Sequence, residues 1–300
     1  MRMNFFILFV FLPFLLGAQT PFPKDTSYTI SSTYQKEIKK FPFISIAKTL
    51  HNENIKSEKQ IIYQQTATRD LHLDAYLFQS QKKLPAVILL HGGGWKSGDK
   101  SQMETLATAI AAKEYNCFAI EYRLSPEAHY PAGYNDVKEA IAFIIKNASR
   151  FNSNPNKIAI LGCSSGGQMA ALLGTTIPNE IQAIVDLDGI LAFHHPESEE
   201  GKIAAEWLGG TYEENPKNWM AASALTHTNK NTPPILFVNS QWNRFHAGRD
   251  DMIRILNQYG IYSEIKTFEN SPHSFWFFNP WFEKTVTFTT HFLDKILKQE

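Results

Sequence analysis

Short apolar runs alternate with amphipathic segments along most of this chain. The runs at 86–90, 158–161 and 235–238 are wholly apolar, which is typical of strands buried on both faces of a sheet. The segments at 103–113 and 135–146 repeat their apolar residues at helical spacing, so each predicts a helix with one face on a core. The full pattern predicts strands at 59–64, 71–78, 86–90, 117–122, 158–161, 181–187, 235–238 and 262–268. It predicts helices at 103–113, 135–146, 167–173, 251–259 and 281–297.

Strands that alternate with helices in this order predict an α/β fold, with a mostly parallel central sheet and helices on both faces. The first two predicted strands are expected to form an antiparallel start. Residues 190–230 break the alternation and predict a lid-like insertion over the ends of the strands. Residues 19–55 are polar and irregular, so we expect an N-terminal extension before one large domain at 56–300.

The first residues of the chain have the pattern of a targeting segment. A lone Arg2 precedes an apolar run at 5–16, and Gly17 and Ala18 supply small residues at its end. This pattern predicts a secretory signal peptide at 1–18 and a secreted or periplasmic protein. The run is shorter than the roughly 20 residues that a membrane-spanning helix needs. We therefore expect no stable membrane insertion, with a retained N-terminal anchor as the alternative.

Composition and charge argue against several kinds of partner. Hydrophobic residues make up 43% of the chain, and 29 basic residues balance 29 acidic ones. A nucleic acid or an anionic membrane surface would favour clustered Lys and Arg, so neither is expected as a partner. Cys117 lies in an apolar run and Cys163 follows one, which predicts buried thiols and no disulfide. No spacing of Cys and His predicts a metal site.

The strongest chemical signal is the segment GCSSGG at 162–167. It follows a predicted strand and precedes a predicted helix, which indicates a tight strand-to-helix turn. Glycines must flank such a turn because a side chain would clash there. A serine at its tip is an exposed nucleophile, and the start of the helix favours negative charge. The spacing of the motif selects Ser164 as the nucleophile, and not its neighbour Ser165.

A second signal, HGGGW at 91–95, directly follows another predicted strand. Consecutive glycines let backbone N–H groups converge on one oxygen atom of a substrate, which describes an oxyanion hole. We expect its donors to be the N–H groups of Gly93 and Gly94, together with that of Ser165. A phosphate-binding loop would end in Gly-Lys followed by Ser or Thr, and this segment does not.

Three segments together resemble the esterase branch of the α/β-hydrolases: HGGGW at 91–95, EYRLS at 121–125 and GCSSGG at 162–167. The resemblance covers about residues 55–300. It implies an α/β-hydrolase fold, a Ser–acid–His triad in that chain order, and no cofactor. The family places its histidine after the last strand, and His273 stands there in this chain.

The triad acid is where this sequence departs from the family pattern. Most relatives carry an Asp after the penultimate strand, but here Asn243 falls near that position. An amide cannot stabilise an imidazolium as a carboxylate does. Asp188 stands at the end of the preceding strand, where some lipases of this fold place the acid, so we assign it that role. The other candidates are Asp186, Asp250, Asp251 and Glu269.

The loop that lacks the usual acid carries Arg244, His246 and Arg249. One interpretation is that these residues pair with the two aspartates that follow and hold the loop. The other is a site for an anionic substrate group, such as a uronate carboxylate, because Arg binds carboxylates through two parallel hydrogen bonds. We predict substrate contacts from these three residues.

Two segments suggest a substrate class. RFHAGRDD at 244–251 and PHSFW at 272–276 are similar to exported bacterial esterases that act on pectin and related wall polysaccharides. On this resemblance, Trp95 and Trp276 join the candidate substrate contacts. The partner is then a small-molecule or polysaccharide ester.

These observations predict a serine carboxylic-ester hydrolase that acts on an esterified plant polysaccharide, as a pectin methyl- or acetylesterase. The alternatives are an esterase of feruloyl or acetyl-xylan type, a serine peptidase of the same fold, and a non-catalytic carbohydrate-binding relative. An intact Ser164, glycine loop and His273 favour an enzyme over a binding protein. A chain of 300 residues leaves no room for the propeller of prolyl peptidases, which argues against a peptidase.

Overall fold

A central sheet of eight strands crosses the part of the chain that the computed structural model describes, residue 25 and residues 27–298. The strand order is β2-β3-β5-β4-β6-β7-β8-β9; β3 is antiparallel to β2 and β5, and every later pair is parallel. The strands are β2 (Ile55–Gln65), β3 (Asp70–Phe78), β4 (Leu84–Leu90), β5 (Asn116–Ile120), β6 (Ser153–Cys163), β7 (Ala183–Leu187), β8 (Ile235–Asn239) and β9 (Ser263–Thr267). The parallel strands therefore share one edge at their carboxyl ends.

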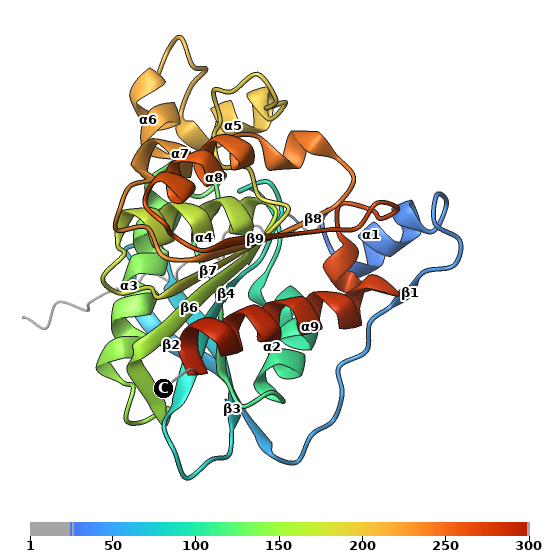
Figure 1. Cartoon of the computed structure of the whole chain (residues 1–300), viewed down its shortest axis with the longest axis vertical. Helices are drawn as coiled ribbons and strands as arrows, with labels where there is room; N and C mark the ends of the chain where they lie inside the picture. Colours follow the sequence, from blue (N-terminus) through green and yellow to red (C-terminus); the bar gives the residue numbers. More distant parts are fainter. Residues whose placement is uncertain (1–24, 26, 299–300) are drawn as a thin grey trace, which may run out of the picture.

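Helices cover both faces of this sheet (Figure 1). Side chains of α2 and α9 belong to the core on one face, and those of α3, α4 and α8 belong to the core on the other. The helices are α1 (Ile30–Glu37), α2 (Glu104–Ala111), α3 (Ala132–Lys146), α4 (Ser165–Thr176), α5 (Gly201–Leu208), α6 (Pro216–Ala221), α7 (Ala224–His227), α8 (Arg249–Gln258) and α9 (Trp281–Leu293). Two short strands, β1 (Ser45–Ile46) and β10 (Phe278–Asn279), form a separate antiparallel pair.

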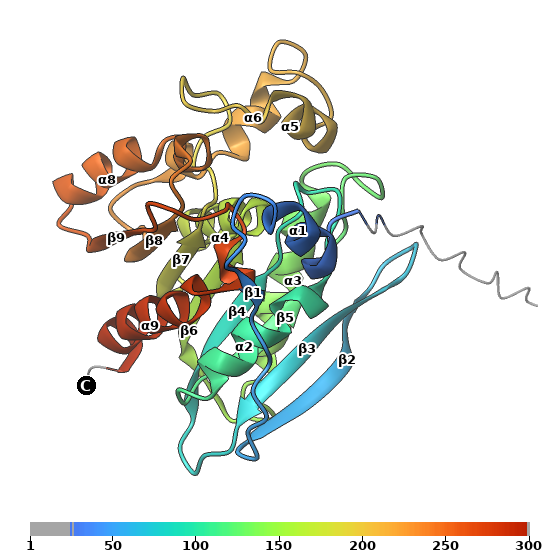
Figure 2. The ribbon, with the colours of Figure 1, turned by 90° about the vertical axis from the view of Figure 1, so that its right-hand side faces the viewer.

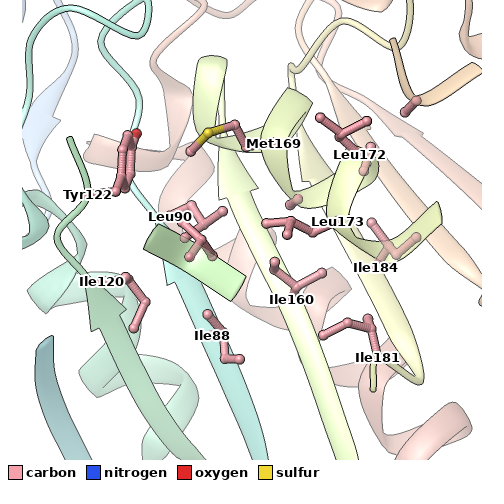
Figure 3. Close-up of a cluster of buried hydrophobic side chains, with 14 of the residues drawn as sticks. Ile88, Leu90, Ile120, Tyr122, Ile160, Met169, Leu172, Leu173, Ile181 and Ile184 are labelled. Atoms are coloured by element: carbon pink, nitrogen blue, oxygen red, sulfur yellow. The ribbon is translucent and has the colours of Figure 1, made fainter. Parts of the chain in front are cut away.

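The core beneath α4 fixes the helix that begins directly after Ser164. Met169 and Leu172 of α4 lie in one buried cluster with Ile160 of β6 and Ile184 of β7 (Figure 3). All four side chains are fully buried. Burying an apolar side chain of this size stabilises a fold by about 1.5–3 kcal/mol. The turn that joins β6 to α4 is consequently held from the helix side.

The predicted α/β fold is confirmed, and each predicted strand and helix has a counterpart in the structure. Several ends differ from the prediction. β6 begins at Ser153, well before the apolar run at 158–161, because Ser153 pairs with Leu84 of β4 through the backbone and the residues between it and Ile158 have no apolar pattern. Cys117 and Cys163 are free, buried thiols, as predicted.

The N-terminal segment contains α1, and the prediction of an irregular extension was wrong in this respect. Thr29 caps the helix: its side chain accepts a hydrogen bond from the N–H of Ser32, whose side chain accepts one from the N–H of Thr29. A helix of only eight residues is too short to show a clear apolar period. The predicted signal peptide at 1–18 lies outside the described residues. No helix among the described residues has the length and apolarity that crossing a membrane requires.

The segment at 190–230 carries α5, α6 and α7 and lies beyond the carboxyl ends of the strands, at the top of Figures 1 and 2. Trp207 of α5 stacks on Trp95 of the glycine loop, with ring centroids 5.1 Å apart. The insertion is therefore packed at the same end of the molecule as the glycine loop. Its role as a substrate lid stays a prediction.

Candidate active site

Ser164 occupies the turn between β6 and α4 in a backbone conformation that few residues adopt. Its φ is 55° and its ψ is −122°. Glycines make this turn possible, because a Cβ on Gly162 would lie 1.9 Å from the carbonyl oxygen of Gly166. A Cβ on Gly166 would lie 2.4 Å from the carbonyl oxygen of Leu90 in β4. This tight turn presents the Ser164 hydroxyl at the carboxyl end of the sheet.

Two further side chains meet Ser164 from separate loops. His273, in the loop after β9, accepts a hydrogen bond at Nε2 from the Ser164 hydroxyl, at 2.8 Å. Its Nδ1 donates to Oδ2 of Asp188, directly after β7, also at 2.8 Å. The structure therefore brings together the predicted nucleophile, base and acid.

The carboxylate of Asp188 is buried and well supplied with hydrogen-bond donors. Its Oδ1 accepts from the backbone N–H of Ser240 at 2.7 Å and from Nε2 of His246 at 3.2 Å. Burial would raise the pKa of Asp188, but the hydrogen bonds from His246, His273 and Ser240 hold that pKa below its ordinary value. Asp188 is therefore ionised at neutral pH, the state that can orient a histidine and stabilise its imidazolium.

His246 and Arg249 support Asp188 from behind. Arg249 Nη1 donates to Asn239 Oδ1 at 2.7 Å and to His246 Nδ1 at 3.4 Å. Because Nδ1 of His246 accepts, its Nε2 carries the proton that it donates to Asp188. Arg249 also donates from Nε to Asp250 at 2.8 Å. The geometry does not support the predicted role of His246 and Arg249 as substrate contacts, since the loop itself uses the donors that an anion would need.

The other residues considered for the acid position are placed differently. Asp250 and Asp251 form ion pairs with arginines of α8. Glu269 and Asn243 are exposed. Within the described residues, no group of three or more His, Cys, Asp or Glu side chains is arranged to hold a metal ion.

Asp186 is buried on β7, two residues before Asp188. Its Oδ1 accepts the N–H of Gly189 at 2.8 Å, while its Oδ2 has no hydrogen-bond partner among the described residues. Burial raises the pKa of Asp186 well above its ordinary value; the Gly189 hydrogen bond opposes this shift, and the charge of Asp188 adds to it. The surroundings of Asp186 thus favour its neutral form, which could not stabilise an imidazolium.

A small cavity of about 20 Å³ lies beside Ser164, lined in part by Gly94 and Ser165. The glycine loop passes close to the nucleophile, since a Cβ on Gly92 would lie 3.1 Å from that of Ser164. Gly93 and Gly94 have φ values of 130° and 60°, which glycine adopts easily. Ser165 is the first residue of α4, so its N–H has no acceptor within the helix. Two of the three predicted oxyanion donors, Gly94 and Ser165, therefore border this cavity.

Glu200, from the insertion, lines the same cavity, and no sequence pattern had singled it out. Its Oε1 is buried with no hydrogen-bond partner among the described residues, and Arg244 Nη1 lies 4.0 Å from it. Burial raises the pKa of Glu200, an effect that the charges of Arg244 and His273 oppose.

A second hollow of about 520 Å³ borders His273, and we call it the α1 groove. One part of its lining is the loop after β8, with Trp242, Arg244 and Phe245; another is the N-terminal segment at 27–41. Phe245 stacks on the ring of His273 with centroids 3.5 Å apart, and it lines both the groove and the small cavity. Of the three predicted basic contacts, Arg244 is the one that lines this groove.

Trp95 and Trp276, both predicted as substrate contacts, are buried. Trp95 donates from Nε1 to Gln168 at 2.8 Å and borders the small cavity. Trp276 packs edge-on against His273, with centroids 5.3 Å apart, so the geometry makes it a support for that ring and not a substrate contact. Trp242, which the sequence reasoning missed, is 43% exposed and lines the α1 groove. Its neighbours in sequence are polar, and that was the available signal.

The known proteins that this chain resembles carry the names of esterases and related hydrolases. The sequence model of the family described as BD-FAE matches residues 73–245. Esterase LipC of Mycobacterium tuberculosis is 28% identical over 193 residues, which are 58% of this chain and 46% of the relative. This chain therefore spans about half the length of that curated relative.

Two solved structures share the fold. A truncated carbohydrate esterase from gut microbiota superimposes with a TM-score of 0.70 at 19% identity, over 84% of this chain and 100% of the other. An acetyl ester-xyloside bifunctional hydrolase from Caldicellulosiruptor lactoaceticus gives a TM-score of 0.67 at 20% identity, over 79% of this chain and 96% of the other. At such identities the likeness establishes the fold alone.

Proposed function

This chain belongs to the BD-FAE family of α/β-hydrolase esterases, and we propose that it is a serine carboxylic-ester hydrolase that removes acetyl groups from the hydroxyls of a plant polysaccharide. The observation that carries the proposal is the hydrogen-bonded line from Ser164 through His273 to Asp188, with both links at 2.8 Å. Such a line, ending beside a cavity bordered by free N–H groups, suits nucleophilic attack on an ester carbonyl.

In the proposed reaction, Ser164 Oγ attacks the ester carbonyl while its proton moves to His273 Nε2. The oxyanion that forms is bound by the N–H groups of Gly94 and Ser165. The imidazolium of His273, stabilised by Asp188, then protonates the departing alcohol oxygen, which leaves an acyl-serine. Water attacks this acyl group as His273 takes its proton, and the carboxylic acid departs as the Ser164 hydroxyl is restored.

The size of the cavity beside Ser164 argues for a small acyl group. At about 20 Å³ it has room for about one water-sized group. The methyl of an acetyl group fits in this volume, whereas the aromatic ring of a feruloyl group is too large for it. In a pectin methyl ester the acyl part is the sugar acid itself, so the same limit disfavours a methylesterase.

The α1 groove argues for a large alcohol. His273 must protonate the departing alcohol, so the alcohol lies on the side that His273 borders. The groove there, about 520 Å³, is within the range of about 300–1,000 Å³ typical of small-molecule sites. The names of the gut carbohydrate esterase and the acetyl ester-xyloside hydrolase agree with a sugar hydroxyl as that alcohol.

A panel of esters tests the proposal. We expect the enzyme to hydrolyse nitrophenyl acetate faster than the butyrate or a feruloyl ester, and to release acetate from acetylated xylan or pectin. Ser164→Ala should lower acetyl turnover by about 10⁶-fold, while the same change at the exposed Ser101 should have no effect. Normal ester turnover by Ser164→Ala, or a preference for the feruloyl or methyl ester, would contradict the proposal. Turnover of amides in place of esters would indicate a peptidase.

We also propose export, with cleavage after Ala18. The pattern of Arg2, the apolar run at 5–16 and the small residues at its end supports this. The intact mass of the protein recovered outside the cytoplasm should correspond to residues 19–300. A mass that retains residues 1–18 would indicate an N-terminal anchor.

A further inference from the structure

The N-terminal segment at 27–41 is a fixed wall of the α1 groove. Tyr28 hydrogen-bonds through its hydroxyl to Ser274 Oγ at 3.4 Å, next to His273. The backbone oxygen of Tyr28 accepts from Gln102 Nε2 at 2.9 Å. The ring of Phe41 packs edge-on against Trp281, with centroids 5.8 Å apart. Figure 2 shows α1, in dark blue, at the same end of the sheet as the start of α4.

The lining of the α1 groove carries more positive than negative charge. Lys36 and Lys40 come from the N-terminal segment, and Arg244 comes from the loop after β8. The side chains of Lys36 and Arg244 are 77% and 43% exposed. Glu37 supplies the one carboxylate of the described lining, and it lies 4.0 Å from Lys36.

Arg244 forms loose ion pairs with two glutamates of the insertion. It lies 3.7 Å from Glu199 and 4.0 Å from Glu200, distances too long for hydrogen bonds. Its guanidinium stacks over the ring of Phe245 at 4.3 Å, which leaves the N–H groups at its edge unused by that contact. Phe245 in turn stacks on His273, so this cation is held near the candidate base.

Trp242 adds an exposed aromatic surface to the groove. The apolar C–H face of a sugar ring packs well on an indole, so Trp242 offers a sugar a stacking surface in the groove. An exposed aromatic ring beside exposed cations differs from the lining expected for a neutral lipid, which would be apolar throughout.

We propose that the N-terminal segment completes the leaving-group side of the active site, and that this subsite binds an acidic polysaccharide whose uronate carboxylates meet Lys36, Lys40 and Arg244. The inference rests on the proposed function for the direction in which the alcohol departs. The anion contacts proposed here come from α1, from Lys40 and from Arg244. His246 and Arg249 are not among them, because the loop uses their hydrogen bonds internally.

Binding of oligosaccharides tests this subsite without turnover. The full chain carrying Ser164→Ala is titrated by calorimetry with trigalacturonate and with neutral xylotriose, at 50 mM and at 500 mM salt. We expect trigalacturonate to bind more tightly, and its advantage to shrink at high salt because exposed charges are screened. Adding Lys36→Ala and Lys40→Ala should weaken the binding of trigalacturonate by about 1.5- to 5-fold per lysine. The binding of xylotriose should not change. Adding Trp242→Ala should weaken the binding of both sugars by about tenfold.

The matched control is the double change Lys82→Ala and Lys83→Ala, since these exposed lysines precede β4 at the opposite edge of the sheet. This control should not alter the binding of either sugar. Equal binding of the two sugars with no effect of the α1 lysines, or no binding at all, would overturn the inference. Hydrolysis of nitrophenyl acetate by the unmodified chain tests the proposed esterase function separately. A failure of that function is therefore distinguishable from a failure of the proposed subsite.

Discussion

Three donors surround the carboxylate of Asp188, and two of them come from the loop after β8. The N–H of Ser240 and Nε2 of His246 bind one oxygen, and His273 binds the other. The resemblance to the esterase branch places the acid in that loop; here the loop provides the donors that keep a buried acid ionised. Arg249 donates a hydrogen bond to Nδ1 of His246, which fixes the tautomer that carries its proton on Nε2.

The first residue-scale prediction concerns His246. Replacing it with Phe removes one donor from Asp188, and kcat should fall by about 10- to 100-fold, the range for a hydrogen bond to a charged group. That donor lowers the pKa of Asp188, so its loss should raise this pKa. Because activity requires ionised Asp188, the acid limb of the pH–rate profile should move to higher pH.

His246→Gln is the matched test of this prediction, because the Gln amide can still donate to Asp188. It should recover part of the rate and shift the acid limb back toward that of the unmodified enzyme. His291→Gln, at an exposed site on α9, is the control and should change neither property. An acid limb that does not move in His246→Phe would mean that His246 only fills space.

The second residue-scale prediction concerns Asp186, whose pKa is raised by burial. Above about pH 4 the unfolded chain ionises this residue while the folded chain keeps it neutral, so its contribution to stability falls as pH rises. Asp186→Asn removes this penalty and retains an oxygen for the Gly189 N–H. Urea unfolding at pH 4, 5.5 and 7 should show a stability advantage of the variant that grows with pH. A constant difference across this range would refute the assignment.

At the scale of elements, the junction of β6 and α4 determines where Ser164 points. The helix lies so close to β4 that glycine is required at its first turn, where a Cβ on Gly166 would lie 2.4 Å from the oxygen of Leu90 and 2.5 Å from that of His91. Both neighbours are backbone atoms, which cannot rotate away. The strand, the helix and the glycine loop are thus positioned as one unit.

We therefore predict that Gly166→Ala lowers the free energy of unfolding by about 3 kcal/mol or more, at or above the upper end for overpacking a core. It should also reduce kcat, because a displaced α4 moves the Ser165 N–H. Gly201→Ala, at the first residue of α5, is the control: an added Cβ there meets nothing within 4 Å. Urea unfolding of the control should give a free energy equal to that of the unmodified chain or slightly higher. Similar unfolding curves for both variants would contradict this account of the junction.

At the scale of the whole molecule, the N-terminal segment is joined to the C-terminal part of the chain. β1 pairs with β10, and the rings of Phe41 and Phe43 pack on Trp281 of α9. Because β10 follows closely after His273 in sequence, we expect the packing of the N-terminal segment to help position the loop that carries the candidate base.

Phe41→Ala tests this connection. Phe41 is buried, so its loss should reduce the free energy of unfolding by about 3–5 kcal/mol. Phe43→Ala is the matched control, since its ring touches the same Trp281 but is 56% exposed, and it should cost much less. Denaturant melts of both variants give the comparison. A cost for Phe41→Ala as small as that of Phe43→Ala would show that the N-terminal segment is only loosely attached.

Sequence reasoning predicted the α/β fold and the positions of its main strands along the chain, because apolar runs and helical spacing are properties of contiguous residues. It also identified Ser164 and the glycine loop, since each directly follows a predicted strand, while His273 was identified through the resemblance to the esterase branch. For Asp188, the absence of an acid near Asn243 directed attention to the neighbouring strand. Parallel strands share their carboxyl ends, so these local signals were enough to place the residues at one edge of the sheet.

The roles of the remaining residues became clear from their three-dimensional surroundings. His246, Arg249 and Trp276 have the chemistry of substrate contacts, but each faces another part of the protein. Lys36 had no distinguishing pattern, and Trp242 had only its polar neighbours in sequence, yet both line the α1 groove. The physical reason is that a side chain's role depends on which groups pack against it from distant parts of the chain. Residue type and local spacing do not carry that information.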